Sequence, residues 1–104
     1  MKLKPGARLI QPQPRLIEAL HDVDILWHIL TGHEVTVTSG DEGYDGDGVH
    51  KTGSFHYKHL AADLRVWDLP KTLRPKIRPL IAWGLGTEWD VIDEKDHLHL
   101  EYDP

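Results

Sequence analysis

The sequence predicts an α+β fold, a small single domain spanning residues 1–104 with a mainly antiparallel sheet and helices packed on it. Three observations support this prediction. The chain has 104 residues, which is enough for one modest hydrophobic core. It has no cysteine, so neither disulfides nor thiolate metal sites can stabilise it. Segments with helix and strand periodicity follow in the order helix, strand, loop, strand, helix, strand, strand.

The first part of the chain predicts a lead-in, a helix and a strand. Residues 1–11 form an irregular or extended lead-in, because a Pro-Gly pair breaks local structure there. Residues 12–31 carry apolar side chains at three- and four-residue steps, which predicts a helix that Gly32 ends. Residues 34–39, EVTVTS, alternate apolar and polar side chains and predict a half-buried strand.

A long loop and a second strand follow. Residues 40–54, GDEGYDGDGVHKTGS, contain five glycines and four acids, so they predict a loop. Loops of this length in small domains are usually functional or disordered, and we expect this one to border an active site. Residues 60–67, LAADLRVW, predict the second strand.

The last part of the chain predicts a helix and two strands. Residues 70–83 have helical apolar spacing, but Pro75 and Pro79 argue against a regular, uninterrupted helix. Residues 86–93 and 97–102, GTEWDVID and HLHLEY, predict the last two strands, joined by a tight connection.

The four tryptophans are predicted to lie in the core. The prediction is firmest for Trp27 and Trp67. For Trp83 and Trp89, lining a groove or covering the second helix is the alternative.

Charge and hydropathy exclude several classes of protein. The net charge is −5 and lysines and arginines form no cluster, so we expect neither nucleic acid nor a membrane as partner. The N-terminus has no apolar run typical of a secretory signal, and no segment is apolar enough to cross a bilayer. We therefore expect a protein that is made in the cytoplasm without a signal peptide. We also expect it to be a monomer.

Histidines supply the candidate chemistry. The chain has eight, and five of them fall in two groups, His50, His56 and His59 in the first, His97 and His99 in the second. Asp63 lies seven residues after His56, in a strand whose alternation turns Asp63 and Arg65 away from the core. A surface ion pair between Asp63 and Arg65 is the simplest alternative to a functional site.

The second histidine group lies on one face of a strand. His97, His99 and Glu101 alternate with apolar residues, a pattern that also fits a plain polar face of an antiparallel sheet. Two imidazoles and one carboxylate make the three-ligand set of a catalytic zinc, and Asp96 could serve as the general base. On residue types alone, either His59 or His97 could replace His56 or His99 as a ligand.

These motifs resemble the LAS metallopeptidases. The resemblance rests on VTSG, then SFHYKHLAADL, then DHLHLE, and it spans residues 35–102. The family includes D-alanyl-D-alanine carboxypeptidases and dipeptidases and phage L-alanyl-D-glutamate endolysins, and hedgehog signalling domains share its fold. Its pattern is Ser-x-His, six residues, Asp, and later an acid three residues before a final His.

The resemblance assigns roles to individual residues. It implies that His56, Asp63 and His99 bind one zinc ion per chain and that Asp96 is the general base. His97 would lie beside the metal without binding it. We expect Ser54, the serine of the pattern, and His59, which departs from it, to form hydrogen bonds around the ligands.

The chain departs from the family in two places. His59 stands where many members have glycine, and an exposed loop histidine is the alternative to a role beside the ligands. No arginine follows Ser39 and Gly40, although the family uses one to stabilise the oxyanion or anchor substrate. We expect Arg65 and His50 to replace it.

The combined reading predicts a zinc peptidase of minimal, phage-like type that acts on the cell wall. It would use metal-activated water to hydrolyse peptidoglycan stem peptides or other peptides containing D-amino acids. D-Ala-D-Ala carboxypeptidase and L-Ala-D-Glu endopeptidase activities are both open. The alternative is a non-catalytic zinc-containing binding domain of the hedgehog-like fold, which would not need an acid at Asp96. A purely structural zinc would need a fourth ligand, such as His97 or His59.

Overall fold

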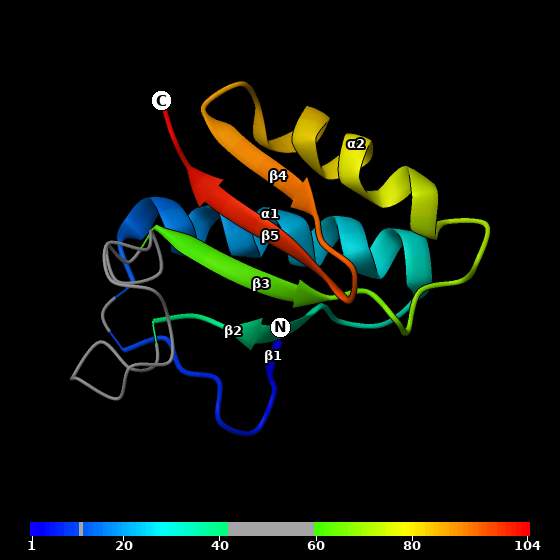
Figure 1. The fold of residues 1–104 in the computed structure, drawn as a ribbon, viewed down its shortest axis with the longest axis horizontal. Coiled ribbons are helices and arrows are strands. Elements are labelled where there is room, and N and C mark those ends of the chain that lie inside the picture. The colour runs from blue at the N-terminus through cyan, green and yellow to red at the C-terminus, as the bar shows by residue number, and fades with distance from the viewer. Residues whose placement is uncertain (11, 42–59) are drawn as a thin grey trace.

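The sheet of the protein has the strand order β1-β2-β3-β5-β4 in the computed structural model, which describes residues 1–10, 12–41 and 60–104. The elements of this part of the chain are β1 (Lys2–Leu3), α1 (Pro14–Thr31), β2 (Thr36–Ser39), β3 (Ala61–Arg65), α2 (Arg74–Leu85), β4 (Trp89–Asp93) and β5 (His97–Tyr102). β1 runs parallel to β2, and the other neighbouring strands pair antiparallel. The radius of gyration is 12.9 Å, as expected for a compact domain of this length. The predicted α+β class is confirmed, with a five-stranded mixed sheet and two helices in the described residues (Figure 1).

One face of the sheet packs on the helices. Leu64 lies opposite Val37 on one side and Leu98 on the other, and all three are fully buried. Side chains of both helices join these strand residues in one core, which includes Leu16, Leu20, Val23, Trp27, Val35, Val66, Ile77, Ile81, Val91 and Leu100. In Figure 1, α1 runs behind the strands. The alternating residues of β3 and β5 therefore point away from the core.

The first helix matches the prediction closely. It begins at Pro14, whose missing N–H falls in the first turn, where it has no helical partner to lose. It ends before Gly32, whose φ of 80° is left-handed and whose N–H donates to the carbonyl of His28.

The second helix is continuous where the prolines predicted an interruption. It begins at Arg74, so Pro75 lies in the first turn. Pro79 lies inside the helix and removes the hydrogen bond that would reach back to the carbonyl of Pro75. Both prolines lie on the exposed side of the helix, where water can satisfy that carbonyl, and Ile77 and Ile81 hold the other side in the core.

The lead-in is more ordered than the sequence predicts. Lys2 donates a backbone hydrogen bond to Val35, and Lys4 donates one to Val37, so the segment adds an edge strand to the sheet. Farther along, the carboxylate of Asp41 accepts a hydrogen bond from the backbone N–H of Ile10. Asp41 is buried, although it was expected in an acidic loop near the active site.

Only one of the four tryptophans is fully buried. Trp27 lies in the core as predicted, and Trp89 packs partly against it, edge to face with Tyr102. Core placement is wrong for Trp67 and Trp83, which are 68% and 86% exposed. Trp67 comes two residues after the end of β3 and lies on the same side as Arg65, away from the core. Trp83 lies on the outer side of α2.

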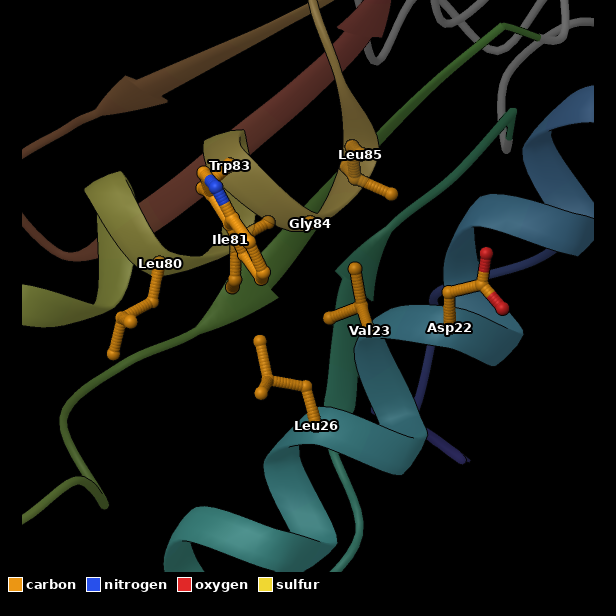
Figure 2. Close-up of a pocket in the computed structure, with 8 residues that line it drawn as sticks. All are labelled: Asp22, Val23, Leu26, Leu80, Ile81, Trp83, Gly84 and Leu85. Atoms are coloured by element: carbon orange, nitrogen blue, oxygen red, sulfur yellow. The ribbon is translucent and has the colours of Figure 1, made fainter.

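An apolar hollow of about 180 Å³ lies between the two helices (Figure 2). Val23 and Leu26 of α1 face Leu80 and Ile81 of α2 across it, and Trp83 stands at its edge. None of the predicted site residues in the described part of the chain lines this hollow, which lies in the helical layer of the domain.

Candidate metal centre

The register of β3 and β5 brings two of the predicted zinc ligands together. Asp63 lies directly opposite His99, although 36 positions separate them in the chain. Oδ1 of Asp63 is 2.7 Å from Nδ1 of His99. Both side chains are about 15% exposed, so the pair is largely shielded from water. On the other side of Asp63, β2 places Ser39 opposite it.

His97 lies on the same face and links Asp63 to Asp96. Its Nε2 is 3.7 Å from Oδ1 of Asp63, and its Nδ1 is 2.7 Å from Oδ1 of Asp96. Asp96 stands just before β5 with an 83% exposed side chain. The candidate general base therefore contacts His97, the neighbour of Asp63, and is open to water.

Glu101 completes this row of side chains. Its Oε1 is 2.8 Å from Nε2 of His99, and its side chain is 17% exposed. Carboxylates and imidazoles thus alternate along the face in the order Asp96, His97, Asp63, His99 and Glu101. Sequence reasoning placed Glu101 on this face but gave it no role. The sequence feature that could have indicated its contact with His99 is the two-residue step between them, which puts both side chains on one side of a strand.

The carboxylates determine the electrostatics of the site. Burial of the His99 ring works against its protonation, but hydrogen bonds to Asp63 and Glu101 outweigh burial and raise the pKa of His99 above its ordinary value. The hydrogen bond from His97 lowers the pKa of Asp96. Asp96 is therefore ionised at neutral pH and can accept a proton.

Asp63 and His99, the two described members of the predicted donor set, offer an oxygen and a nitrogen of the kinds that zinc takes. Two ligands on one tetrahedral zinc stand about 3.3 Å apart, given zinc–nitrogen and zinc–oxygen bonds of about 2.0 Å. Asp63 Oδ1 and His99 Nδ1 are 2.7 Å apart, so a small side-chain rotation would open the space. His97 Nε2, at 3.7 Å from Asp63, stays within reach as an alternative ligand.

Among the described residues, three carboxylates near the end of β5 are the group of donors that lie close enough together to hold a metal ion. Oxygens of Asp90, Glu101 and Asp103 lie within 4.8 Å of one another. An all-oxygen set suits calcium or magnesium better than zinc. Asp90 and Asp103 are exposed, and the hydrogen bond between them raises the pKa of Asp90.

Four predicted site residues lie outside the described part of the chain. They are His50, Ser54, His56 and His59. The structure therefore brings together Asp63 and His99 of the predicted ligand set, with His97 and Asp96 beside them.

A hollow of about 310 Å³ adjoins Asp96 and His97. Its walls also include Lys4, Thr38, Arg65 and Trp67. The guanidinium of Arg65 lies 4.6 Å from the centre of the Trp67 ring, which holds the charge beside the hollow. Among the described residues Arg65 forms no ion pair, so the simple surface pair with Asp63 is absent.

No protein-family model matches the chain, and a search of the curated proteins gives no significant match. Neither of the described helices is long and apolar enough to cross a membrane.

Proposed function

We propose that this protein is a zinc-dependent peptidase of the LAS type, with the hedgehog/DD-peptidase fold. The pairing of Asp63 with His99 is the observation that supports the proposal most. The resemblance implies that both residues bind one metal, and the fold joins them across two strands. The acid expected to act as base contacts His97, which lies 3.7 Å from Asp63. The proposed substrates are peptidoglycan stem peptides or other peptides containing D-amino acids, an assignment that rests on the motif resemblance.

His56, Asp63 and His99 would hold the zinc. Asp63 would bind through a carboxylate oxygen and His99 through Nδ1, the atoms that already lie 2.7 Å apart. When bound, zinc would supply a Lewis acid that polarises the scissile carbonyl and makes water more acidic.

Asp96 would move the proton. Its Oδ1 is engaged by His97, so Oδ2 would take the proton of the attacking water and return it to the leaving amine. His97 would hold the carboxylate in place through this hydrogen bond. In this role the ring, between Asp96 and Asp63, would stand beside the metal, as the resemblance implies.

Arg65 and Lys4 would orient the substrate. Both cations line the hollow that also reaches Asp96, so an anionic group or a developing oxyanion there would be stabilised. This arrangement supports Arg65 as the replacement for the missing arginine. His50, the other proposed replacement, lies outside the described residues.

The alternative proposal is a zinc-containing binding domain without catalysis. One observation favours it: the pKa of Asp96 is lowered, whereas an efficient general base has a pKa near the working pH. In a binding domain, Asp96 would only orient His97.

Hydrolysis of defined peptides tests the proposal. The zinc-loaded protein should cleave at least one of a panel of stem peptides that carry L-Ala-D-Glu and D-Ala-D-Ala bonds, as read by mass spectrometry. Asp96→Ala should lose cleavage but keep zinc, whereas Asp93→Ala, an exposed acid at the same hairpin, should keep both. A wild-type protein that binds zinc but cleaves none of the panel would favour the binding domain. Full cleavage by Asp96→Ala would refute the role of Asp96.

A further inference from the structure

His99 is held at both ring nitrogens. Asp63 contacts Nδ1 at 2.7 Å and Glu101 contacts Nε2 at 2.8 Å. A neutral imidazole has one N–H and one free lone pair, so only one nitrogen can bind a metal while the other donates a hydrogen bond. Metal-binding histidines almost always donate their second N–H to a carboxylate, a carbonyl or a water.

Given the zinc centre proposed above, we propose that Glu101 is a positioning residue that makes Nδ1 of His99 the metal-binding atom. Glu101 accepts the Nε2–H, which fixes the tautomer and turns the Nδ1 lone pair toward Asp63. Glu101 does not touch the metal, and it acts only through the ring of His99.

The strands determine the direction of this contact. Glu101 and His99 are two residues apart on β5, so their side chains lie on one face. Directly opposite Glu101 on β3 is Ala61, which is too small to occupy the space between the carboxylate and the ring.

The neighbouring acids do not share this role. Asp90 stands opposite Glu101 on β4, but its carboxyl group is hydrogen-bonded to Asp103. Both of these acids are exposed, whereas the carboxylate of Glu101 is largely covered. Substitution of Asp90 therefore tests whether the acidic group as a whole, rather than the hydrogen bond of Glu101 to His99, controls zinc binding.

Zinc affinity and the identity of the bound nitrogen test the inference. Affinity is measured by competition with a chromogenic chelator, and the nitrogen is identified from long-range ¹H–¹⁵N correlations of the His99 ring. The wild type should bind zinc through Nδ1. Glu101→Ala should lose about 10–100-fold in affinity and show mixed ring tautomers. Glu101→Gln, whose amide oxygen still accepts the Nε2–H, should keep Nδ1 and lose less. Asp93→Asn, which removes an exposed negative charge of β4 outside both groups of candidate metal ligands, should match the wild type.

Several results would overturn the inference. Glu101→Ala could bind zinc through Nδ1 as tightly as the wild type, or the wild type could bind through Nε2. A loss in Asp90→Asn equal to that in Glu101→Ala would assign the effect to the acidic cluster. If Glu101→Ala does not fold, the ring spectra of the wild type and of Glu101→Gln still decide the bound nitrogen. Zinc binding that survives Asp63→Asn would instead remove the proposed centre itself, and the inference with it.

Discussion

In the proposed zinc site, a proton and the zinc ion compete for the ring of His99, which predicts opposite pH responses in the zinc-free and zinc-loaded protein. Burial opposes protonation, but Asp63 and Glu101 raise the pKa of His99 above its ordinary value of 6.5. The zinc-free native state therefore holds this proton more tightly than the unfolded chain. The resulting stabilisation is fully present below pH 6.5 and is lost as the pH rises through the raised pKa.

The size of this pH effect on the free energy of unfolding follows from the binding of one proton. Within that window, the free energy of unfolding of the zinc-free protein should fall by at most about 1.4 kcal/mol per pH unit. For a domain of this size, 1 kcal/mol corresponds to about 4–8 °C in Tm. Zinc needs the neutral ring, so its affinity should rise about tenfold per pH unit until the proton is gone. Zinc at 100 times its Kd adds about 2.7 kcal/mol.

Thermal unfolding between about pH 6 and pH 9 measures both responses. The wild type is compared with His99→Gln, once in chelator and once in excess zinc, so that other titrating groups cancel in the difference. Relative to His99→Gln, the Tm of the wild type should fall with pH in chelator and rise with pH in zinc. Equal pH profiles for the two proteins under both conditions would refute the reasoning.

Two further predictions concern the lead-in and the hollow beside Asp96. Gly40→Ala should destabilise the fold by about 1–3 kcal/mol in chemical denaturation, because a Cβ there would overlap the backbone oxygen of Arg8. Gly84→Ala is the control, because in the described structure the new Cβ would have no atom within 4 Å other than those of its chain neighbours and its own helix backbone. It should leave stability unchanged or raise it by up to about 1 kcal/mol. Equal effects of the two substitutions would contradict the packing described. If peptides are cleaved, Arg65→Ala should raise KM or lower kcat about 10–100-fold without loss of zinc, as expected for a lost charged hydrogen bond. Arg78→Ala, on the exposed side of α2, should have no effect, and an unchanged Arg65→Ala would remove Arg65 from the site.

The part of the site that lies on the central strands was predictable from sequence. Alternation in β3 and β5 assigns Leu64 and Leu98 to the core, so Asp63 and His99 must lie on the other face. Their direct pairing depends on the register, which periodicity alone does not give. The family resemblance implies that both residues bind one metal and so lie close together, and in the structure they are 2.7 Å apart.

Other features depend on contacts between distant parts of the chain. β1 is two residues long, too short for any periodicity, and it forms because Lys2 and Lys4 reach the backbone of β2 and of the residue before it. Trp67 is apolar, yet its place after the end of β3 turns it toward the hollow, where it stacks with Arg65. The role of Glu101 depends on which partner its carboxylate reaches, and composition carries no information about that choice.

Zinc content per chain tests the central claim most directly. The protein is purified metal-free, loaded with zinc, desalted and measured by elemental analysis, alongside Asp63→Ala and Asp93→Ala. The account predicts about one zinc per chain in the wild type and in Asp93→Ala, and none in Asp63→Ala. A folded wild type without zinc, or full zinc content in Asp63→Ala, would contradict it.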